Sequence, residues 1–294
     1  IRPHHFCPNP QTAADNAFQT QDKSKDSRET ELKAFDKVTQ VAERLRQLGV
    51  EVHLFEDETH DTPDSVFPNN WFSTHSGGYV GVYPMYPKNR RLERRQDVLN
   101  FLKQKYRVQE VVDYSGLELD GIFLEGTGSM VLDHIERIAY ASHSFRTSPV
   151  ALERFCAHFN YEPMLFEARD QNHRLIYHTN VIMCLGSELA LICTEMLVDQ
   201  ARRDEILLRL KQSGREVIDL TSAQIDAFCG NALELTGAHG RFLAMSSTAF
   251  RALSSEQKQN IESRLAIEAF DVDTLELAGG SIRCMLAGIH LTKR

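Results

Sequence analysis

Apolar residues recur about every three to four positions in several segments of the chain, a spacing that predicts helices. The five segments are 27–49, 91–106, 149–159, 204–214 and 254–266. Each is followed by a short run typical of a β-strand. These runs are 50–56, 107–114, 161–167, 215–220 and 266–272. A longer hairpin-like stretch then precedes the next helix, so the order strand, hairpin, helix recurs along the chain.

One polar residue opens each hairpin, and these residues are almost evenly spaced. They are Asn70, Glu125, His178, Asn231 and Cys284, separated by 55, 53, 53 and 53 residues. A repeat of this length predicts a ring of like α/β units within a single domain, residues 1–294. Corresponding positions in a closed ring face one axis. We therefore expect Glu125, His178 and Cys284 to be neighbours, with Asn231 as part of the scaffold.

These three residues have the chemistry of a covalent hydrolase. Cys284, in GGSIRCMLAG (279–288), is the candidate nucleophile, and His178, in LIYHTNVIM, is the candidate acid/base. Glu125, in IFLEGTGSMV, would hold the imidazole or a substrate N–H. Taken alone, Cys284 and His178 are more simply interpreted as core residues and Glu125 as a structural hydrogen-bond acceptor, and only their shared register favours catalysis. Arg283 adds positive charge beside the sulfur if it points inward, whereas strand alternation directs it to a neighbouring pocket or entrance.

Composition and charge narrow the possible partners. The net charge is −8, from 33 basic and 41 acidic residues, which argues against nucleic acid or an anionic membrane as a partner. The longest apolar stretch, 181–198, is broken at Gly186 to Glu188 and indicates a hairpin rather than a membrane span. Six cysteines without a CxxC pair indicate a reducing, cytoplasmic setting, and we expect no secretory leader. The His and Cys spacing predicts no metal, and the chemistry needs no organic cofactor.

Six segments resemble a known superfamily. They are FPNNWFSTH (67–75), LEGTGS (124–129), HTN (178–180), GNALEL (230–235), GGSIRCM (279–285) and the opening RPHHFCPNPQTAADNAFQ. Together they resemble the guanidine-modifying, or pentein, superfamily, and most closely its amidinotransferase-like citrulline utilization hydrolases, over essentially the whole chain. The resemblance implies a five-bladed α/β propeller of ββαβ units. It also implies metal-free covalent catalysis by Cys284, with His178 as acid/base and Glu125 as its carboxylate partner or that of a substrate nitrogen.

The resemblance also implies substrate-binding residues. PDSVF (63–67) is similar to a segment that supplies acidic groups in dimethylarginine hydrolases, so Asp64 would bind the amino acid end of the substrate or its nitrogens. Arg90 or Arg91, in NRRLERR (89–95), would hold the α-carboxylate, as a related loop arginine does in the resembling hydrolases. This basic cluster opens the second predicted helix, where the helix dipole disfavours positive charge.

Asparagines stand where arginine deiminases and dimethylarginine hydrolases carry aspartate. Asn70, or its neighbour Asn69, replaces one Asp, and Asn180 replaces the Asp of a deiminase His-x-Asp motif. Aspartate suits a cationic guanidinium, whereas a neutral amide both donates and accepts hydrogen bonds and suits an uncharged ureido group. The alternative is that these asparagines hold turns.

The favoured activity is therefore hydrolysis of a small amino acid, citrulline, to ornithine, ammonia and carbon dioxide. An arginine deiminase or dimethylarginine hydrolase is the nearest alternative, followed by an amidinotransferase. A pentein-fold binding protein without chemistry is the alternative from another class. The oligomeric state stays open, with a dimer as one option.

Overall fold

The computed structural model describes residues 1–20 and 27–294, and its elements follow the predicted order. The helices are α1 Ser27–Gln47, α2 Gln96–Lys105, α3 Gly126–Ser129, α4 Pro149–Phe159, α5 Gln200–Gln212, α6 Ser222–Asp226, α7 Ser247–Ala252, α8 Ser255–Glu262 and α9 Asp273–Glu276. Short 3-10 turns are η1 Pro68–Asn70, η2 Asn89–Glu93, η3 Ser115–Asp120, η4 Thr179–Val181 and η5 Thr194–Met196. The strands are β1 Arg2–Pro3, β2 Glu56–Asp57, β3 Phe72–His75, β4 Tyr79–Val82, β5 Glu110–Asp113, β6 Met130–Asp133, β7 Ile138–Ser142, β8 Glu162–Phe166, β9 Met183–Leu185, β10 Leu189–Ile192, β11 Glu216–Asp219, β12 Leu233–Gly237, β13 Gly240–Ser246 and β14 Ala266–Phe270.

Four three-stranded sheets share one topology. Their strand orders are β3-β4-β5, β6-β7-β8, β9-β10-β11 and β12-β13-β14. In each sheet the first two strands form an antiparallel hairpin, and the third strand runs parallel to the second. A parallel pair needs a crossover, and a helical segment supplies it each time: α2, α4, α5 or α7 with α8. These are the predicted ββαβ units.

The fifth unit is built differently from the other four. Its strands β1 and β2 are parallel and pair over two positions, Arg2 with Glu56 and Pro3 with Asp57. The strand predicted at 50–56 is therefore regular only at its end. The C-terminal residues run beside the first of the four sheets, where Lys293 pairs with Tyr106 and the Gly288 carbonyl accepts a hydrogen bond from Thr74. The two ends of the chain thus complete the arrangement.

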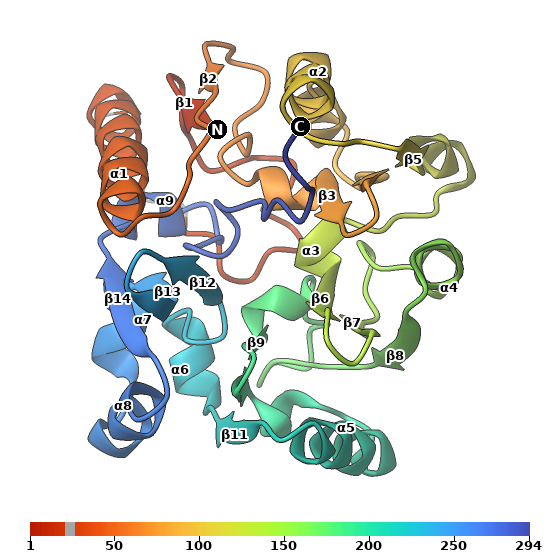
Figure 1. Cartoon of the computed structure of the whole chain (residues 1–294), viewed down its shortest axis with the longest axis vertical. Helices are drawn as coiled ribbons and strands as arrows, with labels where there is room; N and C mark the ends of the chain where they lie inside the picture. The colour runs from red at the N-terminus through yellow and green to blue at the C-terminus, as the bar shows by residue number, and fades with distance from the viewer. Residues whose placement is uncertain (21–26) are drawn as a thin grey trace.

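The units surround a common centre (Figure 1). Helices α1, α2, α4, α5 and α8 lie at the periphery, and β3, β6, β9 and β12 lie toward the middle. Buried apolar side chains fill the space between sheets and helices, as where Leu152 and Phe155 of α4 join Ala139 and Ala141 of β7 in one cluster. The inner strands consequently begin and end close to the axis of the ring.

Two helices differ from their predicted bounds for local reasons. The segment predicted as a helix over 91–106 starts with the turn η2, Arg94 is extended, and α2 begins only at Gln96. The basic cluster therefore precedes the helix, and the expected conflict with the helix dipole does not arise. Helix α5 begins earlier than predicted because the Asp199 side chain accepts a hydrogen bond from the Arg202 N–H, at 2.7 Å, and caps its first turn.

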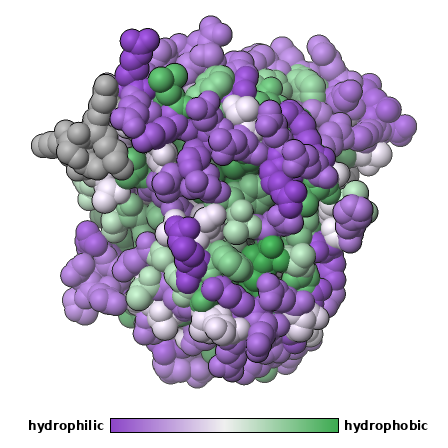
Figure 2. All heavy atoms as spheres, turned by 90° about the vertical axis from the view of Figure 1, so that its left-hand side faces the viewer, coloured by the Kyte–Doolittle hydropathy of each residue, from purple (hydrophilic) through white to green (hydrophobic). Residues whose placement is uncertain are grey.

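The side of the molecule that carries α1 and α8 is largely hydrophilic, with apolar residues between the polar groups (Figure 2). Helix α1 turns Ala34, Val38, Val41 and Leu45 inward, as its periodicity predicts. Among the described residues, no helix is both long enough and apolar enough to cross a bilayer. The apolar stretch 181–198 contains the antiparallel pair β9 and β10, which confirms the predicted hairpin.

Candidate active site

The residues that open the hairpins lie at the starts of the inner strands, but in two different registers. Glu125 and His178 each precede a short helical turn, α3 or η4, and lie five residues before β6 or β9. Asn70 and Asn231 lie two residues before β3 and β12. Cys284 lies in a turn after α9. The regular spacing in sequence therefore corresponds to strictly equivalent positions only for Glu125 and His178.

Glu125 and His178 form a buried pair. Their side chains are joined by a 2.8 Å hydrogen bond between Oε2 and Nε2, and Tyr86 N–H donates to Oε1 at 2.9 Å. Burial alone would raise the pKa of Glu125, but the Arg146 guanidinium and the His178 hydrogen bond outweigh it and hold the pKa at about 2. The group is therefore a carboxylate at neutral pH.

This pair fixes the orientation of the His178 imidazole. Because a carboxylate only accepts hydrogen bonds, Nε2 carries the hydrogen and Nδ1 keeps its lone pair. Gly128 packs against this side of the ring, and a Cβ there would lie 2.8 Å from Nδ1 and would also meet the Asn70 amide. Burial lowers the pKa of His178, and Glu125 opposes that shift in part. At neutral pH the imidazole is uncharged and ready to accept a proton at Nδ1.

Two side-chain amides hold the Cys284 sulfur. Asn180 Nδ2 donates to Sγ at 3.3 Å, and Asn231 Nδ2 donates at 3.2 Å. The Oδ1 atom of Asn231 accepts the backbone N–H of Arg283 at 3.1 Å. Asn231, expected to be scaffold, is thus in direct contact with the candidate nucleophile. Its place in the repeat register was the signal that marked it.

Asp64 and Arg90 belong to a second buried group. Asn9 Nδ2 donates to Asp64 Oδ2 at 2.8 Å, and Arg90 Nε lies 3.6 Å from the same oxygen. Burial raises the pKa of Asp64, and Arg90 and Asn9 reduce that shift. Arg90 binds both oxygens of Glu93 at 2.9 Å and donates to Asn70 Oδ1 at 3.0 Å. The guanidinium that we expected to hold a substrate carboxylate is therefore held by Glu93.

Arg146 and Asp15 form an ion pair beside Glu125 that the sequence patterns do not indicate. The Arg146 side chain is 1% exposed and donates to both oxygens of Asp15 at 2.7 Å. Its Nη1 lies 3.5 Å from Glu125 Oε2, and its guanidinium lies 4.9 Å from the centre of the Tyr177 ring. No local pattern distinguishes a lone arginine in HSFRTS, because its partners lie far away in sequence.

Several buried polar atoms of the predicted substrate-binding residues have no hydrogen-bond partner. They are Asp64 Oδ1, both amide atoms of Asn69, Asn70 Nδ2 and Asn180 Oδ1. Buried polar groups are normally paired, so such a group of unpaired atoms is unusual. The set contains both acceptors and donors, which a small polar molecule requires.

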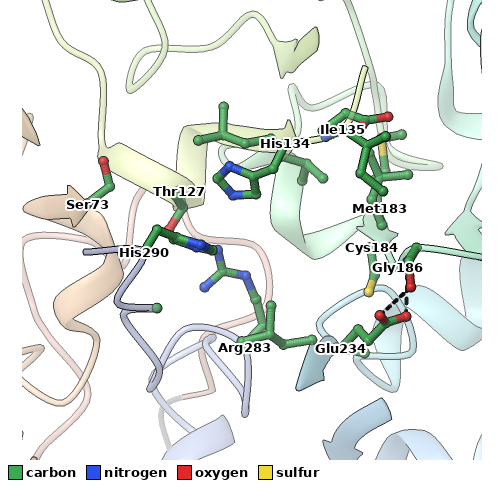
Figure 3. Close-up of a pocket in the computed structure, with 18 of the residues that line it drawn as sticks. Ser73, Thr127, His134, Ile135, Met183, Cys184, Gly186, Glu234, Arg283 and His290 are labelled. Carbon is green, nitrogen blue, oxygen red and sulfur yellow. Dashed lines mark hydrogen bonds between the residues drawn. The ribbon is translucent and has the colours of Figure 1, made fainter. Parts of the chain in front are cut away.

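The two remaining candidates, Arg91 and Arg283, are placed apart from this group. Arg91 is partly exposed, donates to the Met85 carbonyl at 3.0 Å and lies 3.4 Å from Glu118. The side chain of Arg283 lines another cavity together with His134 and His290 (Figure 3), although it still interacts electrostatically with Cys284. We expected Arg283 either beside the substrate or, if the segment were a strand, in a neighbouring pocket; it lines the neighbouring cavity, but from a turn rather than a strand.

Within residues 1–20 and 27–294, no group of three His, Cys, Asp or Glu side chains is arranged to hold a metal ion. What the site does assemble is a thiol held by two amides, an oriented imidazole and an ionised carboxylate. These are the parts of a covalent acyl or amidino transfer site.

Known structures share this fold. One of them is a mutant of the N-terminal domain of ArgZ, bound to substrate; ArgZ is an arginine dihydrolase from the ornithine–ammonia cycle in cyanobacteria. This domain is 17% identical to the chain with a TM-score of 0.73, and the match covers 96% of this chain and 94% of that one. Apo ArgZ is 18% identical with a TM-score of 0.75 over 98% of this chain, which spans only about 40% of ArgZ. A dimethylarginine dimethylaminohydrolase, a mutant in an adduct with S-methyl-L-thiocitrulline, is 14% identical, with a TM-score of 0.63, and 97% of this chain and 96% of that one are covered.

The fold is therefore the α/β pentein fold of the guanidino-modifying superfamily, as the sequence predicts. No curated protein matches the chain. The family model described as N,N dimethylarginine dimethylhydrolase, eukaryotic, matches residues 2–291, and the chain belongs to this family. It is accordingly a hydrolase that acts on C–N bonds, and the alternative of a binding protein without chemistry is not supported.

Proposed function

We propose that this enzyme hydrolyses the terminal ureido group of citrulline to give ornithine, ammonia and carbon dioxide through a covalent Cys284 intermediate. The observation that carries the proposal is the pair of neutral amides, Asn180 and Asn231, that donate to the Cys284 sulfur. The reacting carbon must approach this sulfur, so the groups beside it decide which carbon is accepted. Neutral amides favour a neutral group.

A ureido group matches the unpaired atoms of the site. It presents one carbonyl oxygen and N–H donors, and the site offers an unpaired donor at Asn70 Nδ2 and an unpaired acceptor at Asn180 Oδ1. Asp64 Oδ1 is a further acceptor for a substrate N–H or the α-ammonium group. Arg90 holds Asn70 and Asp64 in position through its own contacts, and in this proposal that is its role.

The reaction follows from the protonation states. His178 Nδ1 accepts the thiol proton, and the Cys284 sulfur attacks the ureido carbon to form a C–S bond. The bond between this carbon and the ornithine nitrogen then breaks, and His178 returns the proton to the departing amine. An S-carbamoyl cysteine remains. His178 next activates a water molecule, whose attack breaks the C–S bond and releases carbamic acid, which decomposes to ammonia and carbon dioxide.

Glu125 stabilises the imidazolium that forms twice in this cycle. Because the pKa of Glu125 is about 2, it stays anionic while His178 carries the extra proton. Arg146, fixed by Asp15, keeps Glu125 ionised in spite of its burial. The fixed hydrogen bond to Nε2 also holds the ring so that Nδ1 points to the same place in both steps.

One observation favours a second candidate, a cationic guanidino substrate such as arginine or a methylated arginine. The buried or half-buried groups around the site include four carboxyl groups and two guanidinium groups, those of Asp15, Asp64, Glu93, Glu125, Arg90 and Arg146. An excess of carboxyl groups attracts a cation. The family description also refers to dimethylarginine.

A substrate panel separates the two candidates. Citrulline, arginine and dimethylarginine are supplied separately, and ornithine, citrulline and ammonia are quantified, with mass spectrometry of the trapped Cys284 adduct. The proposal requires a higher kcat/KM for citrulline than for the two cations, and an adduct whose added mass is that of a carbamoyl group. Faster consumption of arginine or dimethylarginine with release of citrulline would assign the second candidate.

We further propose a reducing, cytoplasmic location. The support is that all six cysteines are free thiols and five of them are buried.

A further inference from the structure

A cavity of about 210 Å³ is lined by Arg283, the residue before Cys284, and by none of Cys284, His178 and Glu125. Its walls come from the inner strands β3, β6, β9 and β12 and from residues 287–290, so it lies between all five units. Figure 3 shows the side chains that line it. The proposed reaction uses none of these side chains, although we had expected one of them, Arg283, at the substrate.

Arg283 is the principal charge in this cavity. Its guanidinium lines the cavity together with His134 and His290 (Figure 3), both of which are exposed. Its side chain donates to one protein acceptor, the Leu286 carbonyl, at 2.9 Å. In the described part of the chain, no carboxylate forms an ion pair with Arg283. Burial lowers the pKa of Arg283, the direction expected for a cation withdrawn from water without a counter-ion.

The two carboxylates that line the cavity are already engaged elsewhere. Asp133 binds Arg215, with distances of 2.7 and 2.9 Å. Glu234 accepts the Ser187 N–H at 3.0 Å and pairs with Arg241 at 3.2 Å. Neither carboxylate is therefore available to compensate Arg283, which is left as the uncompensated charge.

The two imidazoles add hydrogen-bond donors to this charge. His134 Nδ1 is bonded to the Tyr161 hydroxyl at 2.8 Å, so its Nε2 is the nitrogen that can serve a ligand. The ring centres of His134 and His290 are 4.3 Å apart. A guanidinium fork with nearby imidazoles is the arrangement that recognises the oxygen atoms of an anion.

We infer that this cavity binds one small oxyanion between Arg283, His134 and His290. The available volume suits an ion such as phosphate or bicarbonate. Bicarbonate would come from the carbon dioxide of the proposed reaction, and phosphate from the surroundings. Both present the same chemistry, a compact anion with several acceptor oxygens, and their relative affinities distinguish them.

The position of the site connects it to the thiol. Arg283 directly precedes Cys284, and its N–H donates to Asn231, whose amide donates to the Cys284 sulfur. A bound oxyanion neutralises Arg283, a cation that interacts electrostatically with that sulfur, and so disfavours a thiolate. The oxyanion is therefore an inhibitor of thiol reactivity. This second part of the inference rests on the proposed role of Cys284, whereas the binding itself does not.

Isothermal titration calorimetry tests the binding. The full chain is titrated with sodium phosphate and with sodium bicarbonate, with sodium chloride at matched ionic strength as the control. We expect saturable 1:1 binding of at least one oxyanion with Kd below about 10 mM. Arg283→Gln should weaken this binding at least about tenfold, because it removes the charge and the fork. Tighter binding of bicarbonate would identify the reaction product as the ligand, and tighter binding of phosphate an external ion.

A second variant keeps the binding test interpretable if Arg283→Gln does not fold. The double variant His134→Asn/His290→Asn retains Arg283 and should weaken binding about fivefold through the loss of two donors. Circular dichroism shows whether each variant is folded. If neither oxyanion binds saturably to the wild type, or if folded variants bind as tightly as the wild type, the inference is overturned.

Alkylation of the thiol tests the coupling separately. The rate at which iodoacetamide modifies Cys284 is followed by peptide mass spectrometry across pH, with and without saturating oxyanion. We expect about a two- to fivefold slower reaction at neutral pH with the oxyanion bound. Binding without any change in alkylation would overturn the coupling and leave the oxyanion site intact. Failure of the proposed citrulline reaction would change neither calorimetric result.

Discussion

The two sides of Cys284 are polar in different ways. On the side of His178, the buried charges have partners of opposite charge: Glu125 has Arg146 and His178, and Arg90 has Glu93. On the other side, among residues 1–20 and 27–294, the Arg283 guanidinium donates to a backbone carbonyl and forms no ion pair with a carboxylate. A site that must hold reacting groups in one geometry contains the counter-ions of its own charged side chains. A site whose charged side chain has no counter-ion within the protein can bind one from solution.

The largest expected effect distinguishes the Cys284 thiol from a second buried thiol, that of Cys184. Cys284→Ser should lower kcat for citrulline by about 10³-fold or more, because a hydroxyl cannot replace the thiolate as nucleophile. The matched control is Cys184→Ser in β9, a buried cysteine that lines the oxyanion cavity. Steady-state ammonia release measures both variants. Equal losses in the two would show that the two sides of the axis are not chemically distinct.

Glu125→Gln should lower kcat by about 10³-fold, since the imidazolium would lose its carboxylate partner. The pH profile of kcat/KM tests the direction in which the pKa of His178 is shifted. Burial lowers the pKa of His178 below its ordinary value of about 6.5, so the acid limb of kcat/KM should lie below pH 6.5 in the wild type.

Glu125 raises the pKa of His178, so its removal should move that limb to still lower pH. The control is Glu153→Gln on the exposed face of α4, which should leave the profile unchanged. An acid limb that stayed in place or moved upward in Glu125→Gln would contradict the assignment.

Gly128→Ala tests how tightly the catalytic side is packed. The new Cβ would lie 2.8 Å from the His178 ring, so the imidazole must shift, and we expect about a 10²-fold loss of kcat. Gly116→Ala is the matched control, because no atom lies within 4 Å of the added methyl group. Kinetics on both variants, with circular dichroism to confirm folding, are sufficient. Wild-type turnover in Gly128→Ala would show that the imidazole position is not critical.

The smallest of these effects concerns substrate choice. Asn180→Asp places a carboxylate where a neutral amide now contacts the sulfur, which favours a guanidinium over a ureido group. We expect the ratio of kcat/KM for arginine to that for citrulline to rise about tenfold. Asn100→Asp, on the exposed face of α2, adds the same charge far from the sulfur and should leave the ratio unchanged. No change in Asn180→Asp would remove the basis for preferring citrulline.

Much of the fold is written in local patterns. The helix predicted over 149–159 has those bounds because Pro149 begins it and Asn160, with φ of 54°, ends it in the left-handed conformation. The hairpin at β9 and β10 follows from an apolar run broken by polar turn residues. Repetition of such units is visible without coordinates, and it is why Glu125 and His178 could be predicted to lie together.

The rest depends on contacts between residues that no pattern connects. Arg146 and Asp15 are 131 residues apart, and Asn9 and Asp64 are 55 apart. The sequence alone does not show that the residues of either pair are in contact. Arg90 is different, because Glu93 follows it by three residues in NRRLE, and the spacing was a signal that the guanidinium had a local partner.

The first turns of the chain contact distant segments that surround the candidate active site. Asn9 bonds to Asp64, Asp15 to Arg146, and Asn16 donates to the Ala278 carbonyl, 262 residues away. Contacts of such sequence separation are slow to form because they enclose long loops. We therefore expect the candidate active site to be complete only once these long-range contacts have formed. A partly folded chain would contain every reactive group but would have no activity.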